Sequence, residues 1–270
     1  MPRARSCYYP RAARACHAGV NIHRHKSPGA GECHAHGYGA RCKYRNRKIP
    51  TSHFGPEHTF ADAANTLDLA RLCLNLEPVS VRRAPVVHFA GQPVTVPPGA
   101  FLQASMEAQA ALTALVLEAL GDGKGKLLDL FAGCGSFSFP AAQNFHVHAV
   151  EGDAAMATAL TTAANRTGAS KVTVAQRDLF QRPFMVNELA SYAAVIFNPP
   201  QAGAFEQATQ LAASKVKRVI GVSCDPDSFA RDARILTDGG YVLQWVAPVD
   251  QFRWSARIEL VGLFIREKVR

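Results

Sequence analysis

The sequence contains no apolar run that approaches the length of a membrane-spanning helix, and its N-terminus lacks the apolar core of a secretory signal. These two absences argue against a membrane or secreted protein, so the cytoplasm is the expected compartment. Thiols are kept reduced there, which suits a reactive cysteine.

Acidic residues are almost missing from the N-terminal part of the chain. Residues 1–50 contain eleven Lys and Arg residues and one acid, Glu32, whereas residues 51–270 contain nineteen against twenty, so the formal net charge of +9 resides near the N-terminus. Residues 1–60 also lack helical or strand periodicity, and we predict a basic, irregular segment there. Its functional form would be an arm that binds nucleic-acid phosphates in a salt-sensitive manner.

The spacing of a structural metal site is absent as well. The residues of this segment with metal-ligand side chains are Cys7, Cys16, Cys33, Cys42, His17, His34 and His36. Eight residues separate the two cysteines of each successive pair, whereas structural zinc sites use about two to four. We therefore predict no metal site.

The glycine-rich segment 126–137 lacks the lysine of a triphosphate-binding loop. It has the pattern of an apolar strand containing Asp129, followed by a turn through Gly133 and Gly135. Glycines let the backbone approach a ligand closely, and the following helix presents free N–H groups to it. The pattern favours a nucleoside cofactor without a triphosphate, S-adenosylmethionine first, over a dinucleotide, because no third glycine follows.

Carboxylates stand at the ends of the next two predicted strands. Glu151 follows the first strand by about twenty residues, where nucleoside-binding sheets hold a ribose diol. Asp178 stands at the end of the third strand. Each acid alone is also typical of a helix N-cap. Together they indicate a cofactor that lies across one edge of the sheet.

A cysteine and a glutamate accompany two later strands. Cys224 follows the apolar run 218–222, and Glu259 lies thirty-five residues further on, inside another apolar strand. Open α/β sheets place reacting groups at the carboxyl ends of their strands. The alternative interpretations are a buried thiol that packs as a small hydrophobic residue, and a strand glutamate paired with Arg257 or Arg266.

Four motifs occur in order along the chain. They are Asp129-Leu-Phe-Ala-Gly-Cys-Gly-Ser-Phe137, Asn198-Pro-Pro-Gln-Ala-Gly203, Val222-Ser-Cys-Asp-Pro226 and Arg257-Ile-Glu259. In order and spacing the chain resembles the S-adenosylmethionine-dependent RNA 5-methyluridine methyltransferases over roughly residues 85–270, and Phe101-Leu-Gln103 matches the Phe-x-Gln segment before that family's cofactor domain. The N-terminal RNA-binding barrel usual in that family is not recognisable.

The resemblance implies a reaction and a set of roles. It implies methyl transfer from S-adenosylmethionine to carbon 5 of a uridine in tRNA or rRNA, with Cys224 as the nucleophile and Glu259 as the general base. The residues implied to contact the cofactor or to lie beside it are Gln103, Phe131, Ser136, Glu151, Asp178 and Asn198, in addition to Gly133 and Gly135 of the turn.

The chain departs from the family's motifs at two places. The family usually has Asp-Pro-Pro-Arg where this chain has Asn198-Pro-Pro-Gln201, which removes a negative and a positive charge together, and Arg257 stands where the family commonly has His. Asn-Pro-Pro is also typical of amino-group methyltransferases, which are the alternative enzyme class. A non-catalytic RNA-binding or cofactor-binding remnant is the alternative that is not an enzyme.

The pattern of elements predicts an α/β fold. The predicted strands are 127–131, 146–150, 172–175, 193–197, 218–222, 241–246 and 258–265, and the predicted helices are 105–120, 136–143, 153–166, 204–213 and 227–237. Alternating strands and helices indicate a doubly wound, mostly parallel sheet. The last two strands look like the antiparallel pair of class I methyltransferases.

Three regions are predicted along the chain. They are the basic segment 1–60, a partial central β region at 61–100 with a hairpin that turns at Gly91-Gln92, and a methyltransferase domain at 101–270. In the connector between the last two strands, Asp250, Phe252 and Trp254 are candidates for contact with a flipped base; the aromatic residues are equally typical of a cover over the sheet edge.

Overall fold

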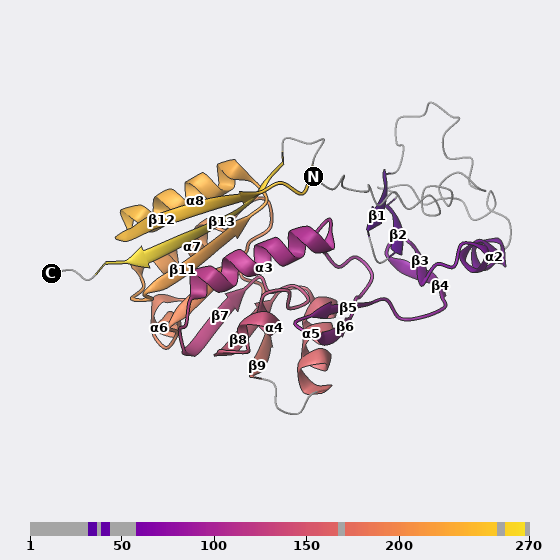
Figure 1. Ribbon diagram of the computed structural model, residues 1–270, viewed down its shortest axis with the longest axis horizontal. Helices are drawn as coiled ribbons and strands as arrows, with labels where there is room; N and C mark the ends of the chain where they lie inside the picture. Colours follow the sequence, from indigo (N-terminus) through magenta and orange to yellow (C-terminus); the bar gives the residue numbers. More distant parts are fainter. Residues whose placement is uncertain (1–31, 37–38, 44–57, 167–170, 253–256, 268–270) are drawn as a thin grey trace, which may run out of the picture. The chain divides into compact units, whose positions relative to one another are not determined.

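The computed structural model describes residues 32–36, 39–43, 58–166, 171–252 and 257–267 (Figure 1). The chain divides into two compact units, one comprising Met1–Val87 with Thr95–Gly99 and the other His88–Val94 with Ala100–Arg270. No helix of the described part combines the length and the apolar character that crossing a membrane requires.

The second unit is built on a seven-stranded sheet. Its strands are β7 (Gly125–Leu130), β8 (Phe145–Glu151), β9 (Val172–Gln176), β10 (Ala194–Phe197), β11 (Arg218–Ser223), β12 (Tyr241–Val249) and β13 (Glu259–Arg266), in the spatial order β12-β13-β11-β10-β7-β8-β9. Strands β7 to β11 pair in parallel, and β13 runs antiparallel to both β11 and β12. The predicted doubly wound sheet with an antiparallel closing pair is confirmed.

The strand order reverses between β7 and β10, which are neighbours in the sheet. Open α/β sheets bind ligands at such a switch point, outside the carboxyl ends of the strands. The loops that follow β7, β8, β10 and β11 all open at this edge. Several of the candidate residues lie in or directly before these loops, whereas Asp178 follows β9, Glu259 begins β13 and Gln103 precedes α3.

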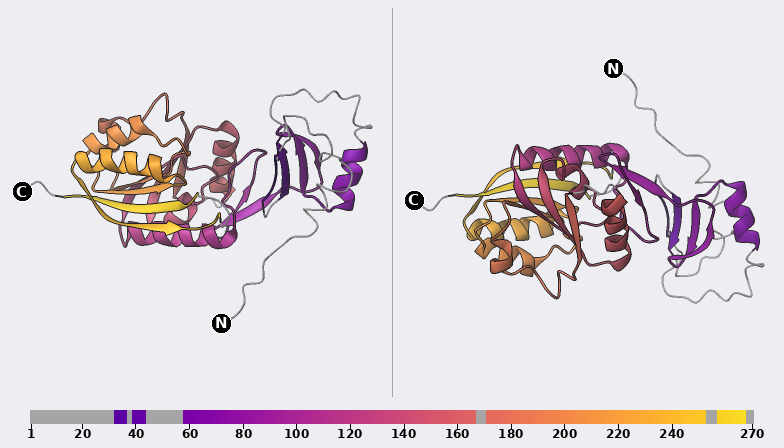
Figure 2. Two further views of the ribbon diagram at one scale, coloured as in Figure 1. Left: turned by 90° about the horizontal axis from the view of Figure 1, so that it is seen from above. Right: turned by 90° about the horizontal axis from the view of Figure 1, so that it is seen from below.

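Helices cover both faces of this sheet. They are α3 (Met106–Leu120), α4 (Ser138–Ala141), α5 (Ala154–Arg166), α6 (Val186–Leu189), α7 (Phe205–Ala213) and α8 (Pro226–Asp238), and Figure 2 shows α3 on one side of the sheet and α8 on the other. Because both faces are covered, β10 is buried along its whole length and β7 over its last four residues. Ser105 caps α3 by accepting a hydrogen bond from the Ala108 N–H at 3.1 Å.

The first unit differs from its prediction within the segment 1–60. A four-stranded sheet joins β1 (Glu32–His36), β2 (Gly39–Lys43), β3 (Arg71–Leu74) and β4 (Glu77–Val81). The helix α2 (His58–Thr66) comes between β2 and β3 in the sequence. The prediction of an irregular segment is wrong for β1 and β2, which pair in antiparallel register. Small apolar and polar residues do alternate in both strands, but over only four or five residues each. The other residues of segment 1–60, apart from the start of α2, lie outside the described residues.

The predicted hairpin is confirmed as β5 (Val86–Phe89) and β6 (Gln92–Thr95). Its turn lies one residue earlier than predicted, at Ala90 and Gly91, which both have positive φ. A second tight turn joins β3 to β4 through Asn75 and Leu76, again both at positive φ. A leucine is unusual at such a position, where Gly is the common signal, so the sequence gives little warning of this hairpin.

Candidate active site

The loop between β7 and α4 uses its two glycines for different reasons. Gly135 has φ of 90°, and a Cβ there would lie 2.4 Å from Leu160 Cδ1, so close packing against α5 requires glycine. Gly133 has φ of 59°, but apart from Gly133 itself and its two chain neighbours no residue has an atom within 4 Å of the position that its Cβ would occupy. The backbone at Gly133 therefore borders open space, as expected of a loop that a ligand approaches.

Glu151 at the end of β8 is fastened to this loop. Its Oε2 accepts from the Gly133 N–H at 2.8 Å and its Oε1 accepts from the Asp153 N–H at 2.8 Å. The carboxylate therefore lies beside the glycine turn, where the spacing of the strands predicted it. Each oxygen has a further lone pair that can accept from a hydroxyl group.

Asp129 plays a different part from Glu151. Its carboxyl group is buried within β7, Oδ2 accepts from Ser138 Oγ at 2.5 Å, and burial raises the pKa of Asp129 to about 7. The bond joins β7 to the first residue of α4, so Asp129 stabilises the glycine turn between them.

Asp178 and Phe180 follow the end of β9, and Phe131 follows the end of β7. Asp178 Oδ1 accepts from the backbone N–H groups of Phe180 and Gln181 at 2.9 and 3.2 Å, which holds the turn after β9. The ring of Phe131 lies 5.5 Å from that of Phe180, centroid to centroid, and Phe131 itself has φ of 62°. A non-glycine residue in the left-handed region is strained, and such strain is concentrated at functional sites. Ser136 is half-buried in the same turn as Gly133.

The loop after β10 forms hydrogen bonds with the end of β7 and with α8 and its N-cap. The Asn198 N–H donates to the carbonyl of Leu130 at 3.3 Å, so Asn198 lies at the switch point beside the end of β7. Gln201 Nε2 donates to Asp225 Oδ2 at 3.4 Å, and the buried Asp232 of α8 accepts from the Ala204 N–H at 3.1 Å. Gln201, one of the two residues that replace the family's charged pair, therefore contacts Asp225, the N-cap of α8.

Cys224 and Glu259 lie beside each other at the ends of adjacent strands. The antiparallel register pairs Ser223 of β11 with Leu260 of β13, so the next residue outward on each strand, Cys224 and Glu259, stands at the same level. Cys224 is half-buried, and Glu259 is only 2% exposed. The two candidate reactive groups are thus brought together from positions thirty-five residues apart.

Burial governs the protonation of this pair. Burial raises the pKa of Cys224 above its ordinary value, the charge of Glu259 raises it further, and a backbone hydrogen bond and Arg257 act in the opposite direction. Burial also raises the pKa of Glu259 to about 7, against the lowering effect of a hydrogen bond from Gln251. A carboxyl group with such a pKa can take up and release a proton near neutral pH.

Arg266 does not pair with Glu259. Its guanidinium donates to the carbonyls of Gly239 and Ala212 at 2.9 and 2.5 Å and stacks over Tyr241. The alternative of a salt bridge between Glu259 and Arg266 is therefore wrong.

Gln251 was not predicted as a site residue. Its amide links Gln103 to Glu259, since Gln251 Nε2 donates to Gln103 Oε1 at 2.6 Å and to Glu259 Oε1 at 2.9 Å. Its neighbour Asp250 accepts from the Phe252 N–H at 3.2 Å and so holds its own turn. Trp254 lies outside the described residues.

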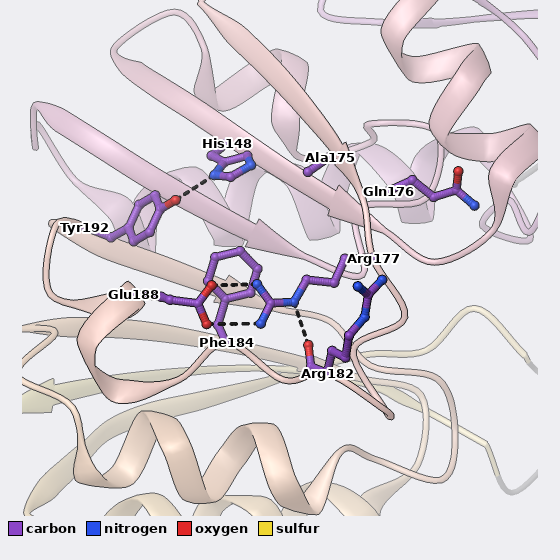
Figure 3. A pocket seen from close by; sticks show the side chains of 8 residues that line it. All are labelled: His148, Ala175, Gln176, Arg177, Arg182, Phe184, Glu188 and Tyr192. Atoms are coloured by element: carbon purple, nitrogen blue, oxygen red, sulfur yellow. Dashed lines mark hydrogen bonds and ion pairs between the residues drawn. The ribbon is translucent and has the colours of Figure 1, made fainter.

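A surface pocket of about 520 Å³ lies elsewhere in this unit (Figure 3). It is lined by His148, Ala175, Gln176, Arg177, Arg182, Phe184, Glu188 and Tyr192. Arg177 forms a salt bridge with Glu188 at 2.6 Å, and His148 Nδ1 lies 2.6 Å from the Tyr192 hydroxyl. None of the predicted site residues lines this pocket, and these polar groups are paired with one another.

Known proteins resemble this chain over most of its second unit. The family model of the tRNA (uracil-5-)-methyltransferases matches residues 94–268. An uncharacterized RNA methyltransferase of Brucella melitensis is 46% identical over 200 residues, which are 74% of this chain and 48% of that protein. The chain thus spans about half the length of the curated relatives it matches first.

Two further proteins carry more specific names. The 23S rRNA (uracil(1939)-C(5))-methyltransferase of Chromohalobacter salexigens is 38% identical over 175 residues, 64% of this chain and 36% of that protein. The crystal structure of Pyrococcus abyssi tRNA (uracil-54, C5)-methyltransferase in complex with S-adenosyl-L-homocysteine matches with a TM-score of 0.64 at 19% identity, over 84% of this chain and 56% of that one. The structural likeness supports the fold.

Proposed function

Since the chain belongs to the tRNA (uracil-5-)-methyltransferase family, we propose that it transfers a methyl group from S-adenosylmethionine to carbon 5 of a uridine in tRNA or rRNA. The observation that carries the proposal is the placement of Cys224 and Glu259 at one level of adjacent strands. Residues 101–270 are the proposed methyltransferase domain.

The glycine loop fits the proposed cofactor. The open space beside Gly133 admits a ligand at the switch point of the sheet, and Glu151 lies next to it with lone pairs for a ribose diol. Phe131 and Phe180 form an aromatic pair near Asp178, of the kind that an adenine ring stacks on. S-adenosylmethionine would supply an electrophilic methyl group at this site.

Cys224 has the role of nucleophile in this proposal. Carbon 5 of uracil is too weak a nucleophile to accept a methyl group unaided. When the Cys224 thiol loses its proton, its sulfur adds to carbon 6, and the electron pair of the carbon 5–carbon 6 double bond forms an enolate with its charge on the carbon 4 oxygen. Carbon 5 of this enolate takes the methyl group of S-adenosylmethionine, with S-adenosylhomocysteine as the leaving group. The half-burial of Cys224 leaves its sulfur accessible to a base that enters the site.

Glu259 has the role of general base. After methyl transfer, carbon 5 carries both a methyl group and a proton. When Glu259 removes that proton, the carbon 5–carbon 6 double bond re-forms and the bond to Cys224 sulfur breaks, which releases the product. A carboxylate whose burial raises its pKa to about 7 is a stronger base than an exposed one.

Mass spectrometry of nucleosides tests this proposal. RNA from cells with a disrupted gene is expected to lose 5-methyluridine at one position in tRNA or rRNA, and incubation with the protein and S-adenosylmethionine is expected to restore it. Loss of a methylated amino group, such as that of a methyladenosine, would instead support the amino-group class. An unchanged nucleoside profile would support the non-catalytic alternative.

Glu151 provides a test of the cofactor site. Glu151→Ala removes a charged acceptor, and we expect it to weaken S-adenosylmethionine binding by about 1–3 kcal/mol in titration calorimetry. Asp153→Ala is the matched control, because Asp153 is a neighbouring acid whose Oδ1 caps the start of α5 through the Met156 N–H. Equal affinities of wild type and Glu151→Ala would remove Glu151 from the site.

A further inference from the structure

The Gln251 side chain lies at the centre of a chain of hydrogen bonds that ends on Glu259. Gln251 Oε1 accepts from the Ala104 N–H at 3.0 Å. Gln251 Nε2 donates to Gln103 Oε1 at 2.6 Å and to Glu259 Oε1 at 2.9 Å. One amide therefore joins the segment before α3 to the proposed base on β13.

The orientation of this amide follows from its partners. A backbone N–H can only donate, so Ala104 requires the oxygen of Gln251 on its side. The amide nitrogen then faces Gln103 and Glu259, and its two hydrogens serve the two acceptors. Every hydrogen-bonding atom of the Gln251 side chain is thus used within the protein.

The same bonds determine which atoms of the neighbours are left for the substrate. Gln103 Oε1 and Glu259 Oε1 are both engaged by Gln251, so among the described residues the groups of these two side chains that remain are the amide nitrogen of Gln103 and Oε2 of Glu259. We propose that Gln251 is a positioning residue that fixes the rotation of the Glu259 carboxylate and leaves Oε2 as the atom that takes the carbon 5 proton. This inference rests on the proposed methyltransferase function and names a residue that acts through its base.

The electrostatics agree with this geometry. The elements that flank Glu259 carry Cys224 and Asp225 directly after β11 and Asp250 directly after β12, and Arg257 precedes Glu259 by two residues and lowers the pKa of Cys224. Burial raises the pKa of Glu259 and the Gln251 hydrogen bond lowers it, because a donor stabilises the ionised carboxylate. Loss of the donor should therefore raise the pKa, so a given fraction of the base form is reached only at higher pH.

Two variants distinguish a positioning role, which acts on Glu259, from a structural role in which Gln251 only holds the backbone at Ala104. Gln251→Leu removes both the donor and the acceptor, whereas Gln251→Glu keeps the shape and the acceptor for Ala104 but places a like charge beside Glu259. A structural role through Ala104 predicts that the rate of proton removal in Gln251→Glu is closer to wild type than the rate in Gln251→Leu. A positioning role predicts that Gln251→Glu is affected as strongly as Gln251→Leu or more strongly.

The measurement is tritium release from RNA that carries 5-tritiated uridine, prepared from cells lacking the gene, since release reports proton removal from carbon 5. In both variants we expect release at pH 7 to slow by roughly tenfold or more, the scale of one charge-assisted hydrogen bond, and its rising limb to move to higher pH. Adduct formation with RNA carrying 5-fluorouridine needs no proton removal and is expected to stay within about twofold of wild type.

Gln210→Leu is the matched control, because Gln210 also accepts from a backbone N–H, that of Val186, at 3.3 Å on α7. It is expected to keep the wild-type rate and pH profile, and circular dichroism verifies the fold of each variant. Wild-type release and pH profile in Gln251→Glu would overturn the positioning role alone. The absence of both adduct and tritium release in the wild-type protein would overturn the proposed function and this inference with it.

Discussion

Replacing Cys224 by Ala is expected to abolish methyl transfer, with a loss on the order of 10⁴-fold or more, the scale seen when a covalent nucleophile is removed. The reason is that carbon 5 attacks only from the enolate that the Cys224 adduct creates. S-adenosylmethionine binding should survive, because the glycine loop and Glu151 are held by bonds that do not involve Cys224. Methylation of RNA from gene-disrupted cells and calorimetry measure the two effects.

A second thiol provides the control for this prediction. Cys73→Ala removes a buried thiol from β3 and should retain wild-type activity. Wild-type protein should also form a covalent adduct with RNA that carries 5-fluorouridine, and Cys224→Ala should form none. Full activity of Cys224→Ala would end the covalent mechanism.

The sheet of the second unit was predictable because its strands are covered on both faces. Such strands appear in the sequence as continuous apolar runs bounded by turns, so β10 was predicted as 193–197 and observed as Ala194–Phe197. Elements without that signal were missed. The short helix α6 (Val186–Leu189) has only one buried residue, Leu189. Strands β1 and β2 do alternate, but over five residues each and with only Ala and Cys as apolar residues.

The strand ends of the site were predictable for the same reason. Once the strands are placed, parallel connectivity brings Glu151 and Asn198 to one edge of the sheet. The opposition of Cys224 and Glu259 depends on the antiparallel register of β13, which no spacing in the sequence determines. Gln251 was missed because a neutral amide gives no signal of charge or reactivity, and its importance lies in three partners that only the fold assembles.

The strongest separation of the two enzyme classes comes from Glu259→Gln. The amide keeps the shape of the carboxylate, and its oxygen can still accept from Gln251 Nε2, as Glu259 Oε1 does at 2.9 Å. Its nitrogen then takes the place of Oε2 and presents donors where the proton must be accepted. We expect methyl transfer to occur once and then to stall, because the product cannot leave Cys224 without loss of the carbon 5 proton.

The expected result is a denaturation-resistant adduct between protein and RNA that accumulates with unmodified uridine, together with loss of multiple turnover. Gel electrophoresis under denaturing conditions detects the adduct, and Glu118→Gln, on the exposed face of α3, is the control that should turn over normally. An amino-group methyltransferase passes through no covalent stage, so in that class the same substitution would trap no RNA. Normal turnover by Glu259→Gln without trapped RNA would contradict the role of Glu259 and favour a reaction centred on Asn198.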